Sequence, residues 1–567
     1  MEGTLIIPFC FRPATNNAMV HELRNKVVVI TGAASGIGER VVRKLVNEDV
    51  KLIAILDIAE KQGVELQNEL NAKYGNKVKY INCDVTKDEL LFAAFETVIR
   101  EAGPIDVLIN NAGILNDSEK AYRLEIDLNV KALVTSSLKG LELMRKDENG
   151  NGGVIINISS IAALCQLAET PIYCATKSAV LQFSNCLGMD SYYSNTGVRV
   201  IAVCFGATDT PLLHLENMQT VDNKIKALIP DLMKTLPMQT PDNAAAGVIE
   251  VLKKGDSGST WLISSGRSAE DISNEVKKAY EMLSALIFNR HACSNKMYEV
   301  VNKVVLVTGG AAGIGAGIVG EFLKEGAKHV AALDVDVNSG KALETELSSK
   351  YGANKIKFYK CDVTTQDLDL AYDSILREFA YIDVVVNCAG IMNDSPDAYK
   401  KEIAVNVTAL ITSSLRAHKL MSKDEGGSGG TIVNVSSIIG LFQSALLPIY
   451  AATKSAVLQF SNGLGMDPNY SQSGVRVVTI CFGVTDTSLI KTTKMGAYDT
   501  KLDEALAAAM KTFTVQRPES AVRGLLEAYK NGSSGSTWLI TSDRPAEDVT
   551  ANVNEGYKVL SRGVFDG

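Results

Sequence analysis

The feature that most constrains this sequence is an internal duplication. Short segments recur 277 positions apart: K-S-A-V-L-Q-F-S-N begins at Lys177 and again at Lys454, and S-G-S-T-W-L-I begins at Ser257 and again at Ser534. A repeating unit of roughly 265 residues is far longer than the period of a solenoid and has the size of a whole domain. The 567-residue chain is therefore predicted to fold as two copies of one domain.

The boundaries of the two copies follow from composition. We expect an extension over residues 1–22, a first domain over 23–288, a linker over 289–298 and a second domain over 299–567. The linker contains R-H-A-C-S-N-K, which is polar and lacks apolar periodicity. The next segment, M-Y-E-V-V-N-K, resembles the natural start of an independent chain. A natural fusion and a gene-modelling artefact both remain open.

Strand-like and helix-like segments alternate within each copy. In the first copy we expect strands at 27–31, 52–56, 78–82 and 107–110, separated by helices at 39–47, 60–74 and 89–101. The expected strands are continuous apolar runs, as in sheets covered by helices on both faces. This pattern predicts an α/β chain of two tandem Rossmann-type domains, each a doubly wound parallel sheet.

A glycine-rich turn follows the first expected strand of each copy. It reads G-A-A-S-G-I-G from Gly32 and G-G-A-A-G-I-G from Gly309. Glycines at a strand-to-helix turn allow a dinucleotide pyrophosphate to approach the backbone at the helix N-terminus. The spacing G-x-x-x-G-x-G differs from the commoner G-x-G-x-x-G, but its place between strand and helix is the one that the mechanism needs.

An acidic residue ends the second expected strand, Asp57 in one copy and Asp334 in the other. A carboxylate at this place accepts hydrogen bonds from the adenosine ribose and repels a 2′-phosphate. Neither glycine-rich turn contains Arg or Lys. The sequence therefore favours NAD over NADP. Asp84 and Asp362, after the third strand, are expected near the adenine.

A third pattern carries chemistry. Ser160 ends an apolar segment, Tyr173 follows thirteen positions later, and Lys177 lies one helical turn beyond the Tyr, in a helix that Pro171 is expected to open. A phenol has a pKa of about 10, and a nearby ammonium favours the phenolate. Tyr173 can thus act as a proton carrier while the Ser hydroxyl holds a substrate oxygen.

Together these motifs resemble the short-chain dehydrogenase/reductase family over nearly all of both copies. Within the family, G-G-V-I-I-N-I-S-S and P-I-Y-C-A-T-K are similar to NAD-dependent hydroxyprostaglandin dehydrogenases, whereas N-A-G-I-L-N-D and G-S-T-W-L-I are similar to insect-type alcohol dehydrogenases. The resemblance implies a Tyr acid/base, a Ser that orients the reacting oxygen, a Lys that lowers the Tyr pKa, and an Asn that completes a proton relay. The implied catalytic residues are Asn129, Ser160, Tyr173 and Lys177, and Asn406, Ser437, Tyr450 and Lys454.

The expected cofactor contacts combine the motifs with this resemblance. They are Gly32, Ser35, Gly36, Ile37, Gly38, Asp57, Asp84, Val85, Asn110, Tyr173, Lys177, Thr208 and Thr210 in the first copy, and Gly309, Gly313, Ile314, Gly315, Asp334, Asp362, Val363, Asn387, Tyr450, Lys454, Thr485 and Thr487 in the second. No metal is implied.

Three positions depart from the family pattern. Phe205 and Phe482 replace the Pro that usually follows the sixth strand, and Cys388 replaces the second Asn of N-N-A-G. The position three before the Tyr is Thr170 in one copy and Leu447 in the other. This last difference argues against a prostaglandin-specific pocket.

The expected function is NAD-dependent interconversion of a hydrophobic, secondary alcohol and its carbonyl, with one site per copy. An amphipathic lid after Thr210, with Leu and Met facing inward, favours an apolar substrate, although its apolar face can equally pack on its own domain. A net charge of −8 argues against nucleic acid. The absence of a long apolar run argues against a membrane span, and scattered cysteines favour the cytoplasm.

Other functions remain open: a non-catalytic NAD-binding scaffold, an NADP-linked carbonyl reductase, and one active copy with one regulatory copy. The catalytic helix also carries the apolar residues Val180, Leu181 and Phe183. Because relatives use this helix as a dimer interface, we expect the two copies to form a pseudo-dimer within the chain.

Overall fold

The computed structural model describes residues 20–285, 297–491 and 494–564. The chain divides into two compact units, one built mainly from the first copy and the other mainly from the second. The extension expected over 1–22 lies almost wholly outside the described residues, and so does the linker except for Met297 and Tyr298.

The first copy is organised around an eight-stranded sheet in the order β3-β2-β1-β4-β5-β6-β7-β8. Its strands are β1 (Val27–Thr31), β2 (Leu52–Asp57), β3 (Val78–Asn82), β4 (Val107–Asn110), β5 (Gly153–Ser160), β6 (Val198–Phe205), β7 (Thr260–Ile263) and β8 (Glu270–Asp271). All neighbours pair in parallel except β7 and β8, which are antiparallel. The strand order reverses between β1 and β4, and in such sheets a ligand binds at this switch point, beyond the carboxyl ends of the strands.

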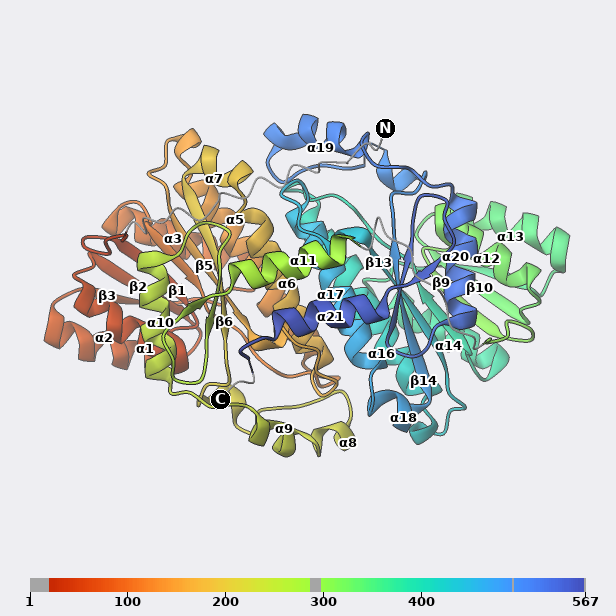
Figure 1. Ribbon diagram of the computed structural model, residues 1–567, viewed down its shortest axis with the longest axis horizontal. Helices are drawn as coiled ribbons and strands as arrows, with labels where there is room; N and C mark the ends of the chain where they lie inside the picture. Colours follow the sequence, from red (N-terminus) through yellow and green to blue (C-terminus); the bar gives the residue numbers. More distant parts are fainter. Residues whose placement is uncertain (1–19, 286–296, 492–493, 565–567) are drawn as a thin grey trace. The chain divides into compact units, whose positions relative to one another are not determined.

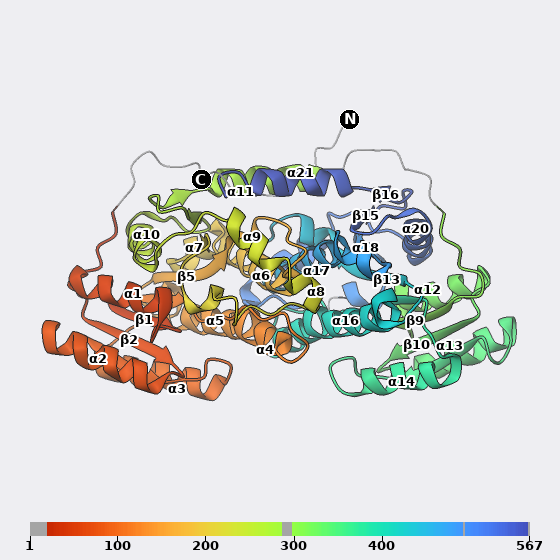
Figure 2. The same ribbon diagram turned by 90° about the horizontal axis from the view of Figure 1, so that it is seen from below.

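Helices cover both faces of this sheet (Figure 1). They are α1 (Gly36–Leu45), α2 (Glu60–Tyr74), α3 (Asp88–Ala102), α4 (Tyr122–Ile126), α5 (Leu133–Met144), α6 (Pro171–Leu187), α7 (Asp190–Thr196), α8 (Asn223–Lys226), α9 (Ile229–Thr235), α10 (Pro241–Lys254) and α11 (Ser273–Ala285). Side chains of α1, α2 and α10 share one apolar core with alternate residues of the strands. In Figure 2, α2 and α3 lie beside β2.

The second copy repeats this architecture in the order β11-β10-β9-β12-β13-β14-β15-β16. Its strands are β9 (Val304–Thr308), β10 (His329–Asp334), β11 (Ile356–Lys360), β12 (Val384–Asn387), β13 (Gly430–Ser437), β14 (Val475–Phe482), β15 (Ser536–Ile540) and β16 (Glu547–Asp548). Its helices are α12 (Gly313–Lys324), α13 (Val337–Tyr351), α14 (Asp367–Phe379), α15 (Tyr399–Ile403), α16 (Leu410–Met421), α17 (Pro448–Gly465), α18 (Asn469–Ser473), α19 (Asp503–Met510), α20 (Pro518–Asn531) and α21 (Thr550–Leu560).

The strand residues explain this arrangement. Every residue of β1 and of β9 is buried, and burying one Val or Ile side chain contributes about 1.5–3 kcal/mol. Such strands are stable only with a helical layer on each face. The predicted doubly wound α/β class is confirmed, with the addition of one short antiparallel strand at the edge of each sheet. Of the helices within the described ranges, none combines the length and apolar character needed to cross a bilayer.

Candidate active site

The glycine-rich turns occupy the switch point of each sheet. Gly32 has a φ of 63°, and a Cβ at this position would lie 2.6 Å from the Cα of Ala112. Gly309 has a φ of 68°, and a Cβ there would lie 2.8 Å from the Cα of Ala389. Helices α1 and α12 begin four residues later. The turn thus presents bare backbone at a helix N-terminus, which suits a pyrophosphate.

Each expected ribose-binding carboxylate braces its own glycine-rich turn. Oδ2 of Asp57 accepts a hydrogen bond of 2.9 Å from the Ala34 backbone N–H, and Oδ2 of Asp334 accepts one of 3.1 Å from the N–H of Ala311. A carboxylate oxygen has further lone pairs, so both side chains can still accept from a ribose hydroxyl. Asp362, after β11, accepts from the N–H and hydroxyl of Thr364, which lower the pKa of its carboxyl.

The Ser, Tyr and Lys of the second copy meet at the end of β13. Ser437 is the last residue of that strand, and its hydroxyl donates to the carbonyl of Phe482 at 3.4 Å, close to Tyr450 on α17. Lys454 lies one turn further along α17, with its Nζ 5.6 Å from the centre of the Tyr450 ring. In the first copy, Ser160 likewise ends β5, while Tyr173 and Lys177 are both buried on α6.

The two buried lysines are held by backbone oxygens. Nζ of Lys177 donates to the carbonyl of Ile158 at 3.2 Å, and Nζ of Lys454 donates to the carbonyl of Val435 at 3.1 Å. Burial lowers the pKa of each ammonium to about 8, against a smaller opposing effect of nearby acidic groups. Both lysines therefore still carry a charge near neutral pH.

The pKa of Tyr450 moves in the direction opposite to the one that base catalysis needs. Burial raises it most, the carboxyl groups of Glu402 and Asp394 raise it further, and the nearby hydroxyl of Ser437 lowers it. Burial and the two carboxyl groups together disfavour the phenolate more than Ser437 favours it. A positive charge delivered to the site would oppose this shift.

The expected relay asparagines sit in a π-helical turn, over Asp127–Ala132 in the first copy and Ala404–Ala409 in the second. The amide of Asn129 donates to the carbonyl of Ile114 at 2.8 Å, and its Oδ1 accepts from the N–H of the same residue at 2.9 Å. A Cβ at Gly113 would lie 3.1 Å from Oδ1 of Asn129 and 3.5 Å from Nζ of Lys177. Asn129 and Lys177 thus flank one small space.

Asn110 and Asn387 point into the core of their domains. The amide of Asn387 donates to Ser414 at 3.0 Å and to Asn434 at 2.8 Å. Asn110 makes the corresponding bonds to Ser137 and Asn157. These side chains tie β4 to β5 and β12 to β13, and the predicted cofactor contacts of Asn110 and Asn387 stay predictions.

The next position differs between the copies. Asn111 donates to the carbonyls of Thr31 and Gly32 at 3.0 and 2.7 Å and so ties the N-N-A-G segment to the glycine-rich turn. Cys388 cannot make these bonds, and burial raises the pKa of its thiol to about 11. The second copy thus lacks one brace of its cofactor turn.

The expected nicotinamide contacts Thr208 and Thr485 are anchored by a glutamine that the sequence analysis did not single out. Gln239 Nε2 donates to the hydroxyl of Thr208 at 3.1 Å, and Gln516 Nε2 donates to Thr485 at 2.9 Å. Thr487 lies over the glycine-rich turn, because a Cβ at Gly313 would be 3.3 Å from its methyl group. A buried polar residue just before a Pro-initiated helix is the only signal that the sequence offered.

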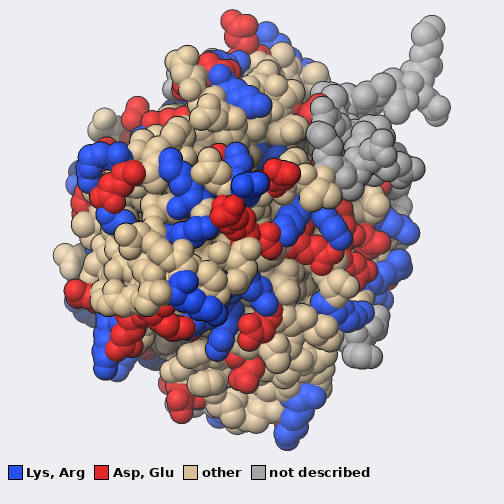
Figure 3. Space-filling view, turned by 90° about the vertical axis from the view of Figure 1, so that its left-hand side faces the viewer, with Lys and Arg blue, Asp and Glu red and all other residues tan. Residues whose placement is uncertain are grey.

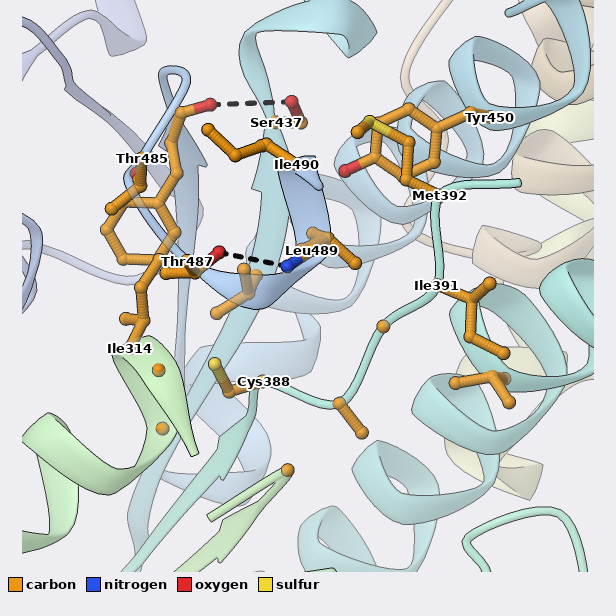
Figure 4. A pocket seen from close by; sticks show the side chains of 18 of the residues that line it. Ile314, Cys388, Ile391, Met392, Ser437, Tyr450, Thr485, Thr487, Leu489 and Ile490 are labelled. Atoms are coloured by element: carbon orange, nitrogen blue, oxygen red, sulfur yellow. Dashed lines mark hydrogen bonds between the residues drawn. The ribbon is translucent and has the colours of Figure 1, made fainter. Parts of the chain in front are cut away.

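A cavity of about 610 Å³ opens over these elements in the second copy. The hydroxyl of Tyr450 points into it, with Met392, Ile490 and Leu489 nearby (Figure 4). Of the expected second-copy residues, Gly309, Gly313, Ile314, Gly315, Asp334, Asp362, Val363, Ser437, Tyr450, Lys454, Thr485 and Thr487 line this cavity. Asn387 and Asn406 are not among the lining residues. The lining also includes the apolar residues Phe442, Leu447, Met510 and Phe513.

The expected lid of the first copy is only partly inward-facing. Met218, Ile225 and Ile229 are buried, whereas Leu215 is 50% exposed. The prediction that the Leu and Met residues face inward is therefore wrong for Leu215. In the second copy, lid residues Leu489, Ile490 and Met510 do line the cavity.

The fold and site define a class: a doubly wound dinucleotide-binding domain with a Ser, Tyr and Lys at the switch point, built twice. The sequence model described as short chain dehydrogenase matches residues 26–220 and 303–496. The chain therefore belongs to the short-chain dehydrogenase family, as a tandem duplication. Members of this family are oxidoreductases that bind a nicotinamide cofactor and act on small molecules.

Two groups of relatives match at similar levels. The chain is 33% identical to 15-hydroxyprostaglandin dehydrogenase (NAD(+)) of Bos taurus over 235 residues, which are 41% of this chain and 87% of the relative. It is 33% identical to alcohol dehydrogenase 1 of Ceratitis cosyra over 243 residues, 42% of this chain and 92% of the relative. Each match thus has the length of one copy.

A solved structure shares the fold across both copies. It is the C-domain of a bacterial malonyl-CoA reductase with NADP, with a TM-score of 0.61 and 15% sequence identity, covering 90% of this chain and 96% of that chain. Within the described ranges, no three His, Cys, Asp or Glu side chains cluster in a way that could hold a metal ion.

Proposed function

We propose that this chain is an NAD-dependent alcohol dehydrogenase with one active site in each copy, acting on hydrophobic, secondary alcohols. The observation that carries the proposal is the second-copy cavity, which is lined by Ser437, Tyr450 and Lys454 together with the glycine-rich turn and several apolar side chains. The relatives include enzymes named for NAD and for alcohol oxidation.

The residues of the cavity fit a dinucleotide. Gly309 leaves open the space that a Cβ would fill, and Asp334 lines the same cavity. Asp334 favours NAD because its carboxylate repels a 2′-phosphate. A bound NAD supplies the hydride-accepting ring and, in its oxidised form, a positive charge.

The proposed roles of the side chains follow from their contacts. Ser437 donates a hydrogen bond to the alcohol oxygen and holds it beside Tyr450. The phenolate of Tyr450 accepts the hydroxyl proton as the alcohol is oxidised, and returns it in the reverse direction. The ammonium of Lys454, fixed by the carbonyl of Val435, stabilises the phenolate. Asn406 steadies the same small space through its bonds to Ile391.

The apolar side chains that line the cavity support a hydrophobic alcohol as the substrate. Leu447, Met510 and Phe513 offer no hydrogen-bonding side chains there, so a polar substrate would lose hydration without compensation. The corresponding position to Leu447 in the first copy is Thr170. We therefore expect the two copies to accept overlapping but unequal sets of alcohols.

Single Tyr→Phe variants test this function. NADH formation is followed by absorbance with aliphatic, terpenoid and prostanoid alcohols for the intact chain, Tyr173→Phe, Tyr450→Phe and the double variant. The single variants are expected to lose different parts of the substrate range, and the double variant to lose turnover while still binding NADH. Identical profiles for the two single variants would refute unequal sites, and turnover by the double variant would refute Tyr catalysis.

The same proposal covers the domain boundaries, the assembly of the two copies and the location of the protein. We take 23–288 and 299–567 as the two domains, and propose that they form an intrachain pseudo-dimer through their catalytic helices, in a cytoplasmic protein. On the face shown in Figure 3, Lys and Arg side chains are interspersed with Asp and Glu. Such a mixed surface gives no support to a nucleic-acid partner.

A further inference from the structure

Two acidic side chains are completely buried beside the catalytic helix of the second copy. Asp394 lies in the loop after β12, and Glu402 lies on α15; neither has exposed surface. Burying two carboxylates without compensation is unfavourable by several kcal/mol per charge. Neighbouring groups therefore have to stabilise the two carboxyl groups by hydrogen bonds, by opposite charge or by a bound proton.

Asp394 caps the first turn of the catalytic helix. Its Oδ2 accepts a hydrogen bond of 2.6 Å from the N–H of Ile449, and its Oδ1 accepts one of 3.0 Å from the N–H of Tyr450 itself. These N–H groups have no partner within α17, because a helix leaves its first N–H groups unsatisfied. The positive end of the helix dipole further favours a negative charge here. Burial raises the pKa of the Asp394 carboxyl to about 7, and the two N–H groups oppose this rise, so Asp394 is the more readily ionised member of the pair.

Glu402 is the protonated member. One oxygen, Oε1, accepts from the N–H of Asn393 at 3.3 Å. The other, Oε2, is buried and finds no hydrogen-bond donor among the described residues, and the carboxyl group that acts on it most strongly is that of Asp394. A proton on Oε2 turns this unsatisfied acceptor into a donor toward the Asp394 carboxylate. Burial and the neighbouring Asp394 accordingly raise the pKa of Glu402 well above its usual range.

The first copy repeats the pair. Asp117 and Glu125 are completely buried at the corresponding positions, and Oε2 of Glu125 accepts from the N–H of Asn116 at 3.0 Å. Burial, followed by Asp117, raises the pKa of Glu125, as in the second copy. The buried Asp–Glu pair is therefore present in both copies, although their lids differ in sequence.

Two titratable groups on α17 face the pair. The carboxyl groups of Glu402 and Asp394 both raise the pKa of Tyr450, so each additional negative charge makes the phenolate harder to form. The second group is Lys454, whose ammonium lowers the pKa of Glu402 and so favours its ionisation. One proton on the pair keeps its charge at a single unit, which Lys454 can balance.

We propose that Asp394 and Glu402 are positioning residues that share one proton, so that Asp394 fixes the backbone of Tyr450 while Glu402 adds no second charge beside the phenol. The corresponding pair in the first copy is Asp117 and Glu125. The kinetic consequences of this inference rest on the proposed function. The shared proton can be present whether or not the chain oxidises alcohols.

Kinetics of the second copy test the positioning role. In the full chain carrying Tyr173→Phe, only the second copy turns over. Glu402→Gln keeps a neutral donor toward Asp394, and we expect kcat to fall by no more than about 3-fold. Asp394→Asn removes an acceptor from the helix cap and is expected to lower kcat by about 10- to 30-fold, with KM and the NADH Kd changed by less than about 2-fold. Equal losses in the two variants would overturn the proposal.

The pH profile separates positioning from simple stabilisation. In the Tyr173→Phe chain, loss of the shared proton at high pH places a second charge beside Tyr450, so alcohol oxidation should decline on the alkaline side. Glu402→Gln cannot gain this charge and should show a smaller decline, caused by deprotonation of Lys454 alone. A decline of the same size in Glu402→Gln contradicts the inference.

An infrared measurement is independent of catalysis. A protonated carboxylic acid buried at neutral pH gives a C=O stretching band, which should be present in the native chain at pH 7.5. It should disappear in the Glu125→Gln, Glu402→Gln double variant. If no alcohol is oxidised but the band behaves in this way, the proposed function fails and the shared proton stands. Absence of the band from the native chain overturns the inference.

Discussion

Replacing Gly309 by Ala is the most direct test of where the cofactor binds in the second copy. Two structural effects add. The φ of 68° is unfavourable for any residue with a Cβ, by about 1–2 kcal/mol. The new Cβ would also lie 2.8 Å from the Cα and 2.9 Å from the N of Ala389, and such overpacking against backbone costs about 1–3 kcal/mol. The sum is about 2–5 kcal/mol.

Gly426 provides a matched control. Its φ is 88°, but a Cβ there would meet nothing within 4 Å. Gly426→Ala therefore carries the backbone effect of about 1–2 kcal/mol alone. Thermal unfolding of both variants should show the larger loss for Gly309→Ala.

Fluorescence titration with NADH supplies the functional measurement. The native chain and Gly426→Ala are expected to bind two NADH molecules per chain. Gly309→Ala should keep one site of native affinity and weaken the other at least about 10-fold, which is about 1.4 kcal/mol. Two sites of unchanged affinity in Gly309→Ala would refute the placement of the pyrophosphate at this turn.

Two further predictions concern charge and assembly. Burial lowers the pKa of Lys454 from 10.5 to about 8. Below pH 8 the charged side chain therefore reduces the free energy of unfolding by about 3 kcal/mol. This loss of stability shrinks as the pH rises from 8 to 10.5, because the unfolded chain then also loses the proton. The substitution Lys454→Met also removes the hydrogen bond to Val435, which contributes about 1 kcal/mol. The variant should therefore unfold at a higher temperature than the native chain at pH 7, show no such gain at pH 10, and have no turnover in the second copy. Lower stability of the variant at pH 7 would contradict this prediction. For assembly, small-angle scattering should give one compact particle, and independently tumbling halves would exclude the pseudo-dimer.

Much of the fold could be predicted because its signals are local. The expected strands at 27–31, 78–82 and 107–110 and the helix at 60–74 agree with β1, β3, β4 and α2. Their apolar runs and bounding turns lie within single segments. The edge strands β8 and β16 have two residues each, which is too short to produce a pattern.

The candidate site was predictable only where chemistry and spacing coincide. Ser437, Tyr450 and Lys454 come together because a strand end and a helical turn fix their separation. Asp394 and Glu402 carried no such signal, since nothing local shows that a loop folds back over the start of a helix 54 residues beyond Asp394 in the sequence. The same is true of Gln516, whose partner Thr485 lies 31 positions away.

The duplication has a consequence for how such an enzyme changes over generations. When two identical subunits assemble, a mutation alters both sites at once, so a harmful substitution impairs both of them. A chain that encodes its two copies separately can retain one site while the other varies. The two copies already differ at Asn111 and Cys388 and at Thr170 and Leu447, while both keep the Ser, the Tyr and the Lys. Such a chain can acquire a second specificity without first giving up its original one.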